Sequence, residues 1–199
     1  MRFLALGDSY TIGESVPPTD RWPVQLTALL STEGFNIDDP LIIAATGWTT
    51  DELLSGIDRA NLQGIYDLVS LLIGVNNQYR GRDLEEYRRQ FVALLKRAVG
   101  FANGVPAHVL VLSIPDWSVA PFAAGRDRAK IAAEIDQFNV INREEAERAG
   151  AHYIDVTSIS RQAAADPELI AGDGLHPSGK MYAEWARLAL PVARKAINP

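Results

Sequence analysis

Five short apolar runs alternate along the chain with segments in which apolar residues recur at helical spacing. Each run is about as long as a β-strand, and most are apolar on both faces, which is typical of parallel strands covered by helices on either side. The alternation predicts an α/β fold with three layers, α/β/α, around a parallel sheet. Because crossovers are right-handed, few topologies remain, and we favour a five-stranded, flavodoxin-like sheet of order 2-1-3-4-5. The runs are 3–6, 41–45, 68–73, 109–114 and 153–156.

The segments between these runs carry signals for the starts and ends of helices. Asp20 is a candidate N-cap, and Asp83 followed by Glu86 has the pattern of a capping box. Pro177 suits the first turn of the last helix, and Pro191 should kink or fray the end of that helix. These signals indicate that each segment between strands folds as a helix of the outer layers.

The length of 199 residues and the hydrophobic content of 47% indicate one folded domain, spanning 1–199, rather than a disordered chain. No stretch approaches the roughly 20 apolar residues of a membrane span. The first apolar run is shorter than the core of about 7–15 residues that a secretory signal needs, so we expect Met1 to begin the folded domain. We therefore expect a cytoplasmic protein, and a periplasmic or secreted one stays open if the natural chain begins before Met1.

The charge balance argues against a nucleic-acid partner. The 19 basic and 25 acidic residues give a net charge of −6, and such a surface repels phosphate. The chain has no cysteine, which excludes disulfides, thiolate metal sites and cysteine nucleophiles. We interpret the pairs Arg80/Arg82 and Arg126/Arg128 as solvated surface, with phosphate or carboxylate binding as the less favoured interpretation. The sequence does not indicate an oligomeric state.

A polar segment follows each apolar run, and an open parallel sheet binds ligands beyond the carboxyl ends of its strands. Because all five segments should meet at that one edge, the histidines can be sorted by position. His108 and His152 precede their strands and should lie at the opposite edge, so only His176 can meet Ser9. The polar segments are 7–11, 46–49, 74–77, 115–117 and 173–177.

Three of these side chains have the chemistry of nucleophilic catalysis. Asp173 comes three residues before His176, close enough in a turn to bind the second imidazole nitrogen. Ser9, His176 and Asp173 would then supply the nucleophile, the general base and the orienting carboxylate. Acyl transfer also needs donors for the developing oxyanion, and we assign these to the N–H groups of Ser9 and Gly47 and the carboxamide of Asn76.

The residues that carry this chemistry resemble the four sequence blocks of the SGNH (GDSL-type) hydrolases. The resemblance implies a serine ester hydrolase, without a cofactor or metal, that acts on small-molecule carboxylic esters of lipids or carbohydrates, or on thioesters. It also implies that Ser9, Asp173 and His176 form the catalytic triad, and that Ser9, Gly47 and Asn76 form the oxyanion hole. The blocks, in the family's order and at its usual spacings, are Gly7-Asp8-Ser9, Gly47, Gly74-Val75-Asn76 and Asp173-Gly174-Leu175-His176-Pro177.

Two positions depart from the family's pattern. Asn77 stands where the family usually has aspartate, and Tyr10 replaces the usual leucine after the serine. We expect Asn77 to brace its loop and Asp8 to hold the serine loop, neither of them with a role in the chemistry. The candidate substrate-binding residues, all predicted at the active edge, are Tyr10, Trp48, Tyr79, Trp117 and Phe122.

Other functional classes explain less of the pattern. Residues 174–180 fit most of a phosphate-binding P-loop, but Met181 stands where the Mg²⁺-binding Ser or Thr should be. An α/β-hydrolase elbow, Gly-x-Ser-x-Gly, would need glycine where this chain has Thr11. A non-catalytic flavodoxin-like binding domain stays open, because a fold alone does not exclude it. Among ester hydrolases, no lid is obvious, so we favour a short-acyl esterase or lysophospholipase-like enzyme over a carbohydrate O-deacetylase or a thioesterase.

Overall fold

A computed structural model describes residues 1–197 of the chain. Within these residues, five strands form one parallel sheet of order β2-β1-β3-β4-β5, which confirms the predicted flavodoxin-like topology. β1 and β3 pair from Phe3 opposite Leu68 to Gly7 opposite Leu72, so the segments that follow these two strands emerge side by side. The strands are β1 (Phe3–Gly7), β2 (Leu41–Ala44), β3 (Leu68–Leu72), β4 (Val109–Leu112) and β5 (His152–Ile154).

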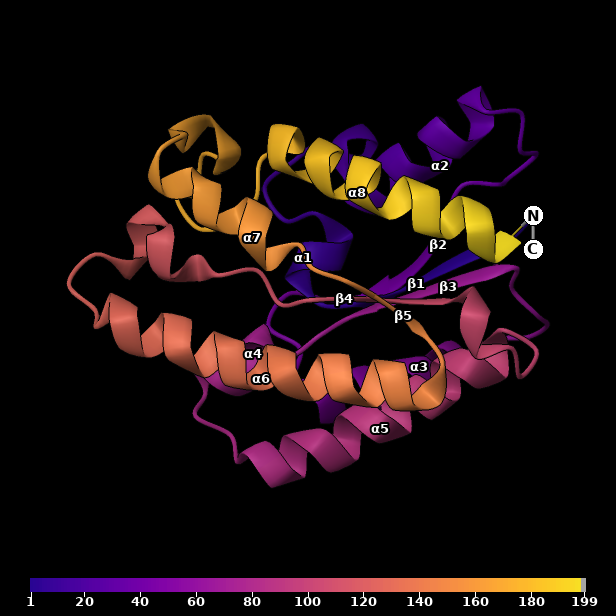
Figure 1. The fold of residues 1–199 in the computed structure, drawn as a ribbon, viewed down its shortest axis with the longest axis horizontal. Coiled ribbons are helices and arrows are strands. Elements are labelled where there is room, and N and C mark those ends of the chain that lie inside the picture. Colours follow the sequence, from indigo (N-terminus) through magenta and orange to yellow (C-terminus); the bar gives the residue numbers. More distant parts are fainter. Residues whose placement is uncertain (198–199) are drawn as a thin grey trace.

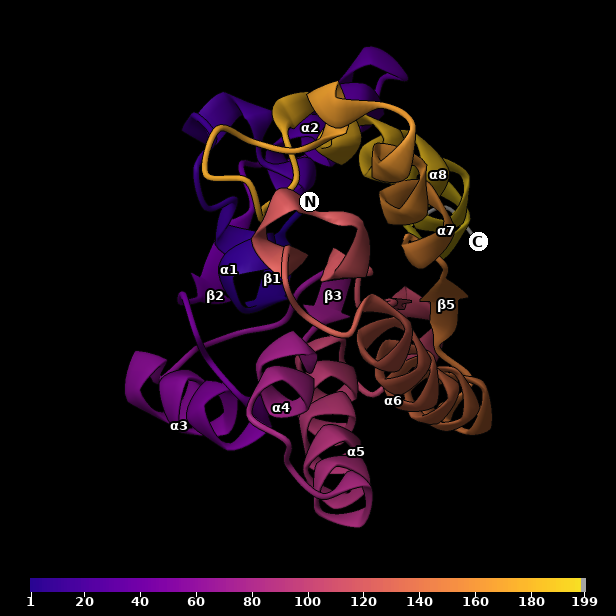
Figure 2. The same cartoon turned by 90° about the vertical axis from the view of Figure 1, so that its left-hand side faces the viewer.

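Helices cover both faces of the sheet (Figure 1). On one face α2 (Trp22–Thr32) packs against α8 (Gly179–Ile197), and the other face is covered by α3 (Thr50–Ala60), α5 (Leu84–Phe101) and α6 (Arg128–Ala149). Figure 2 shows the three layers end-on, which confirms the predicted α/β/α arrangement. The shorter helices are α1 (Ser9–Ile12), α4 (Val75–Tyr79), α7 (Thr157–Ser160) and the 3₁₀ turns η1 (Pro18–Asp20), η2 (Pro106–His108), η3 (Trp117–Val119), η4 (Pro121–Ala123), η5 (Arg161–Ala164) and η6 (Pro167–Leu169).

The hydrophobic core lies on both faces of the central strands. Every residue of β1, β3 and β4 is buried, as expected for strands that are covered on both sides. β2 departs from this expectation because it is an edge strand, and its Leu41 is 41% exposed. On the α2/α8 face, Trp22 packs edge-on against Phe3 of β1 with ring centroids 6.3 Å apart. Trp22 and Trp185 are both fully buried there, as the helical spacing predicts.

The predicted helix starts are partly correct. Asp83 is the N-cap of α5, as predicted, and its carboxylate accepts the N–H of Glu86 at 2.9 Å. The prediction of Asp20 as an N-cap is wrong, because Asp20 ends η1 and α2 begins only at Trp22. Pro23 occupies the first turn of α2, where a backbone N–H would have no helical partner in any case, and no side chain caps this start.

The last helix also begins later than predicted. Pro177 pairs with Ile170 in an isolated antiparallel bridge, and α8 begins at Gly179. The helix then continues through Pro191 instead of fraying there. A proline removes one intrahelical hydrogen bond, and the buried alanines on either side of it keep this part of α8 packed.

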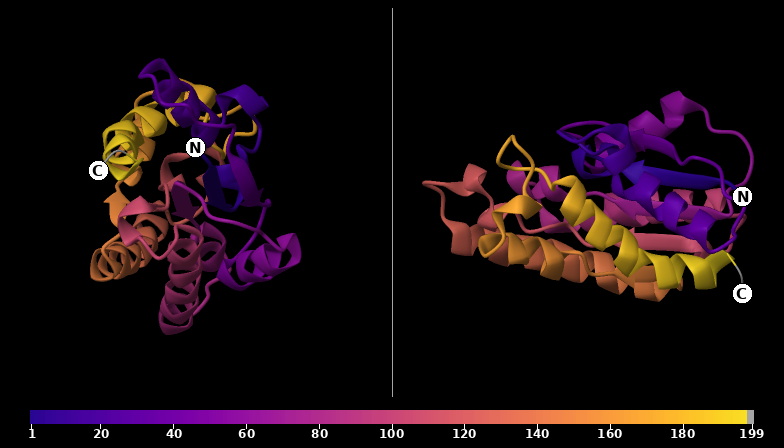
Figure 3. Two further views of the ribbon diagram at one scale, coloured as in Figure 1. Left: turned by 90° about the vertical axis from the view of Figure 1, so that its right-hand side faces the viewer. Right: turned by 90° about the horizontal axis from the view of Figure 1, so that it is seen from above.

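β1 begins and α8 ends at the same end of the molecule (Figures 1 and 3). The carboxyl ends of the strands point toward the other end, which faces the viewer in Figure 2. The polar segments of the predicted site follow the strands, so the fold gathers them at this second end.

Candidate active site

The candidate catalytic residues come from four separate segments beyond the carboxyl ends of the strands. Ser9 begins α1 directly after β1, Gly47 follows β2, and Asn76 lies in α4 after β3. Asp173 and His176 come from the loop that leads into α8. The other two histidines lie in η2, just before β4, and at the start of β5, so both are at the amino ends of their strands, as predicted.

A chain of hydrogen bonds joins Ser9, His176 and Asp173. Ser9 Oγ lies 3.1 Å from His176 Nε2, and His176 Nδ1 lies 2.6 Å from Asp173 Oδ2. Asp173 Oδ1 also accepts the backbone N–H groups of Leu175 and His176, at 2.9 and 3.0 Å. This tight turn explains how a separation of three residues brings the carboxylate to the imidazole. Ser9 and His176 are 4% and 9% exposed, so the bond between them is shielded from water.

Ser15 is a fourth member of this series of hydrogen bonds, and nothing in the sequence predicted its contact with Asp173. Its Oγ donates to Asp173 Oδ2 at 2.7 Å, and its backbone φ is 66°. That left-handed conformation is strained for serine, and a serine in a loop carries no sequence signal for it. Partial burial acts to raise the pKa of Asp173, but the hydrogen bonds from His176, Leu175 and Ser15 outweigh burial and lower the pKa. Asp173 therefore stays ionised at neutral pH.

Gly7 and Asp8 set the position of Ser9 at the start of α1. Asp8 is the N-cap of this helix, and its Oδ1 accepts a backbone N–H of the first turn at 3.0 Å. A Cβ at Gly7 would lie 2.1 Å from Thr11 Oγ1 and 2.5 Å from the carbonyl oxygen of Leu72, so only glycine fits there. Burial raises the pKa of Asp8 to about 7. Within the described chain, its Oδ2 has no hydrogen-bond partner.

The loop after β2 carries one candidate oxyanion donor, Gly47, and is anchored by a second, Asn76 of α4. Gly47 has a φ of 83°, which favours glycine. Asn76 Nδ2 donates to the carbonyl oxygen of Trp48 at 2.9 Å, which uses one of its two carboxamide hydrogens and leaves the other for an oxyanion. Arg80 donates to the carbonyl oxygen of Gly47 at 2.7 Å and pairs with Glu52 at 3.3 Å. Arg80 is exposed, in line with its interpretation as solvated surface, and its guanidinium also anchors this loop.

Asn77 braces the neighbouring segment, as the sequence predicted. Its Oδ1 accepts the N–H of Thr50 at 3.1 Å, and its Nδ2 donates to Thr50 Oγ1 at 2.8 Å. The side chain is buried and ties α4 to the start of α3. An aspartate, the residue usual in the similar family, could accept one of these bonds but could not donate the other.

A cavity of about 180 Å³ opens beside Ser9 and His176. One predicted lining residue, Trp48, lies elsewhere: its ring packs on Gly56 of α3, where a Cβ would come within 2.3 Å of the indole. The prediction for Trp48 is therefore wrong, because the tryptophan fills a gap that this glycine leaves in α3. The other four predicted substrate-binding residues all line the cavity, and they are Tyr10, Tyr79, Trp117 and Phe122.

Tyr79, Trp117 and Phe122 form one side of this cavity, here called the aromatic wall. Their ring centroids lie 5.7 to 6.4 Å apart. Trp117 is 5% exposed, whereas Tyr79 and Phe122 are 49% and 41% exposed, so the wall runs from the interior to the surface. Trp117 Nε1 donates to Gln78 Oε1 at 2.9 Å, and Gln78 donates in turn to Glu134 at 2.7 Å, which fixes the indole.

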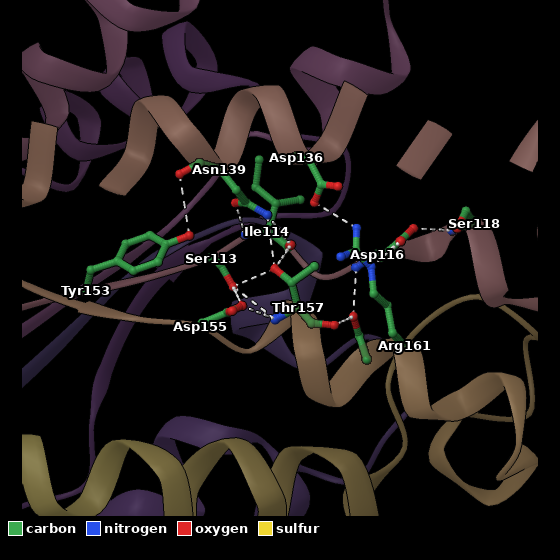
Figure 4. A network of polar contacts seen from close by, with 11 residues as sticks. Ser113, Ile114, Asp116, Ser118, Asp136, Asn139, Tyr153, Asp155, Thr157 and Arg161 are labelled. Carbon is green, nitrogen blue, oxygen red and sulfur yellow. Dashed lines mark hydrogen bonds and ion pairs between the residues drawn. The ribbon is translucent and has the colours of Figure 1, made fainter. Parts of the chain in front are cut away.

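A polar network pins the loop that carries Trp117 (Figure 4). Asp116, next to Trp117, forms an ion pair with Arg161 at 2.8 Å. Asn139 of α6 accepts the N–H of Ile114 at 2.7 Å and donates to its carbonyl oxygen at 2.9 Å. Sequence reasoning did not find this network, because its members come from elements far apart in the chain.

Neither a metal site nor a membrane-spanning helix is found among the described residues. These residues hold no group of three or more His, Asp and Glu side chains that could bind a metal ion. None of the helices between Met1 and Ile197 combines the length and the apolar character needed to cross a membrane.

Comparisons with known proteins identify a family and a shared fold. The family model for the GDSL-like Lipase/Acylhydrolase family matches residues 5–184, a span that includes every candidate catalytic residue. TesA is similar in structure, with 17% identity, a TM-score of 0.76 and coverage of 98% of this chain and 99% of that chain. The psychrotrophic esterase EstA from Pseudoalteromonas sp. has 18% identity, a TM-score of 0.74 and coverage of 100% and 99%.

A third similar structure is Axe2, an acetylxylan esterase from Geobacillus stearothermophilus. It has 17% identity, a TM-score of 0.68 and coverage of 100% of this chain and 94% of that chain. At these identities the likeness concerns the fold. Comparison with curated proteins found no significant match.

Proposed function

The chain belongs to the GDSL-like lipase/acylhydrolase family of hydrolases, and from that premise we propose that it hydrolyses carboxylic esters through an acyl-enzyme on Ser9. The observation that carries the proposal is the unbroken hydrogen-bond chain from Ser9 through His176 to Asp173, with distances of 3.1 and 2.6 Å. This series of hydrogen bonds ends at a cavity of about 180 Å³, in which an ester can reach the serine hydroxyl.

Acylation begins when Ser9 Oγ bonds to the ester carbonyl carbon while His176 Nε2 takes the hydroxyl proton. The N–H groups of Ser9 and Gly47 and the carboxamide of Asn76 stabilise the oxyanion that forms. The bond to the leaving alcohol then breaks, and His176 supplies the proton of that alcohol. Asp173 stays ionised throughout, holds the imidazole in the tautomer that accepts at Nε2, and stabilises the imidazolium.

Deacylation repeats these steps with water in place of the serine. His176 takes a proton from water as the water oxygen bonds to the acyl carbon. It returns a proton to Ser9 Oγ as the acyl–Oγ bond breaks, and the carboxylic acid leaves. One histidine therefore serves both halves of the cycle and ends in its starting state.

The size and lining of the cavity bear on the substrate. A volume of about 180 Å³ beside the aromatic wall favours short acyl groups, in a short-acyl esterase or a lysophospholipase-like enzyme. A carbohydrate O-deacetylase is the second candidate. The fold likeness to an acetylxylan esterase supports it, and so do the exposed rings of Tyr79 and Phe122, on which the apolar face of a sugar can pack.

Turnover of a substrate panel tests the proposal. We expect kcat/KM on p-nitrophenyl esters to be highest for short acyl groups and to fall as the chain outgrows the cavity, with Ser9→Ala inactive. An acetylated xylo-oligosaccharide and an acyl-CoA in the same panel test the deacetylase and thioesterase alternatives. Ser31→Ala, which removes an exposed serine of α2, is the matched control and should keep full activity. A folded protein that turns over none of these substrates would favour a non-catalytic binding domain instead.

A further inference from the structure

The guanidinium of Arg126 lies over the aromatic wall. Arg126 belongs to the loop between η4 and α6. Its Cζ is 5.4 Å from the ring centroid of Tyr79, 5.5 Å from that of Trp117 and 4.9 Å from that of Phe122. The same three rings line the cavity beside Ser9. Cation–π attraction therefore holds a positive charge at the rim of the catalytic cavity.

Most of the hydrogen-bonding capacity of Arg126 is unused. Across residues 1–197, its side chain has one hydrogen-bond partner, the hydroxyl of Tyr79 at 3.4 Å, and no carboxylate within ion-pair distance. The adjacent Asp127 is the N-cap of α6 and accepts the N–H of Lys130 at 3.0 Å. A guanidinium carries five N–H donors on its edge, and stacking on aromatic rings uses only its face. The donor edge is therefore free to bind a ligand.

Two nearby arginines show the more usual arrangement. Arg128 donates to the carbonyl oxygen of Ser118 at 2.7 Å, so it stabilises the loop beneath the wall. Arg161 is neutralised by Asp116 at 2.8 Å and by Asp136 of α6 at 2.7 Å. Arg126 differs from both, because its contacts hold the charge in place without neutralising it.

We propose that Arg126 binds a carboxylate or phosphate group carried by the ester and makes the enzyme selective for anionic substrates. The inference rests on the proposed function, because the rings that hold the guanidinium also line the cavity that presents the ester to Ser9. The planar fork of arginine suits two parallel bonds to such a group. The net charge of −6 would otherwise disfavour an anionic ester, and a cation at the rim offsets that repulsion. The proposal replaces the interpretation of Arg126 as solvated surface.

Matched substrate pairs test the proposal, because the members of each pair are close in size and differ mainly in charge. For a carboxylate on the alcohol side, the pair is p-acetoxybenzoate and its methyl ester. For a carboxylate on the acyl side, the pair is mono-p-nitrophenyl glutarate and p-nitrophenyl pentanoate. For a phosphate, the pair is p-acetoxyphenyl phosphate and its dimethyl ester. The readout is the ratio of kcat/KM for the anionic member to that for the neutral member.

In Arg126→Gln we expect this ratio to fall about tenfold or more for at least one pair, mainly through KM, since charge-assisted hydrogen bonds are lost. Arg126→Lys should recover part of the ratio, because it keeps the charge but not the fork, and added salt should weaken the preference. Arg143→Gln is the matched control, because Arg143 also stacks on an aromatic ring, that of Tyr153 at 4.8 Å, away from the cavity lining. An unchanged ratio in Arg126→Gln for all three pairs would overturn the proposal, as would an equal fall in Arg143→Gln.

Direct binding separates this proposal from the proposed function. The product p-hydroxybenzoate can be titrated against the protein by following tryptophan fluorescence, because Trp117 lines the cavity. Binding about tenfold weaker in Arg126→Gln would support the anion site even if no ester were turned over. Equal affinity of both proteins for p-hydroxybenzoate, together with unchanged ratios for the other two substrate pairs, would overturn it even if neutral esters were good substrates.

Discussion

Asp173 and Asn76 each combine a proposed chemical role with an observed structural contact. Asp173 holds the ring of His176 at 2.6 Å, and it also accepts two backbone N–H groups and the hydroxyl of Ser15. Asn76 anchors the carbonyl oxygen of Trp48 and keeps one N–H for an oxyanion. Substitutions at single residues should therefore separate effects on turnover from effects on the fold around the site.

Removing the base should abolish turnover. We expect His176→Ala to be inactive with the fold intact, because the other histidines lie at the opposite ends of the strands. Asp173→Asn should lower kcat by up to about 10⁴-fold, since an amide stabilises the wrong tautomer. Steady-state kinetics, with circular dichroism as the folding check, measures both effects. The control is His152→Ala, and a loss in it equal to that in His176→Ala would contradict the site assignment.

Removing the Asn76 donor should act on the chemical step. We expect Asn76→Ala to lower kcat about 10²–10³-fold with little change in KM, because the oxyanion exists only in the transition state. Asn77→Asp is the comparison variant, and its effect on kcat should be mild because that side chain braces α4 against α3. Should Asn77→Ala stop turnover while Asn76→Ala leaves it unchanged, the donor assignment would be wrong.

The proximity of Ser9 and His176 could be predicted from the sequence because strand order and the carboxyl-end rule place both at one edge. Ser15, Arg80 and Arg126 could not be predicted in the same way. Ser15 acts from a backbone conformation that its residue type disfavours, and both arginines depend on partners contributed by other loops. Trp48 was misplaced because a position in an edge loop does not determine the direction of a side chain.

Helix boundaries were predictable where a local contact decides them. Asp83 caps α5 by accepting a bond three residues ahead, and Gly150 ends α6 with a φ of 79°. Asp20 and Pro177 had suitable residue types, but other contacts decide their structure. Asp20 closes a 3₁₀ turn, and Pro177 is held by its bridge to Ile170.

The cap of α1 should make stability depend on pH. Burial raises the folded-state pKa of Asp8 from 3.8 to about 7, so the protonated carboxyl favours folding. This contribution is full below the ordinary pKa and is lost as the pH rises through the folded value. We therefore expect Asp8→Asn to gain stability relative to the unsubstituted protein between about pH 4 and about pH 7, by up to about 4 kcal/mol.

Urea unfolding across that pH range measures the effect. Asp39→Asn, which alters an exposed aspartate, is the control and should track the unsubstituted protein at every pH. A stability difference for Asp8→Asn that stayed constant with pH would contradict the raised pKa.

One continuous hydrophobic core joins the helices of both faces to the sheet. It extends from Phe3 in β1 to Ala196 in α8 and includes buried residues of α2, α5 and α6. We propose on this ground that the chain folds as a single domain. Thermal unfolding should then show one transition that coincides in far-ultraviolet circular dichroism and in tryptophan fluorescence, to which buried Trp22 and Trp185 contribute. Two separate transitions would contradict a single domain.

In the proposed mechanism Ser9 is a nucleophile activated by His176. Mass spectrometry after reaction with a fluorophosphonate tests this activation, because an activated serine displaces fluoride and keeps the phosphonyl group. We expect one adduct per chain, on the peptide that contains Ser9, with none in Ser9→Ala and far slower labelling in His176→Ala. A folded protein that remains unlabelled, or that carries the adduct on another residue, would show that Ser9 is not the activated nucleophile.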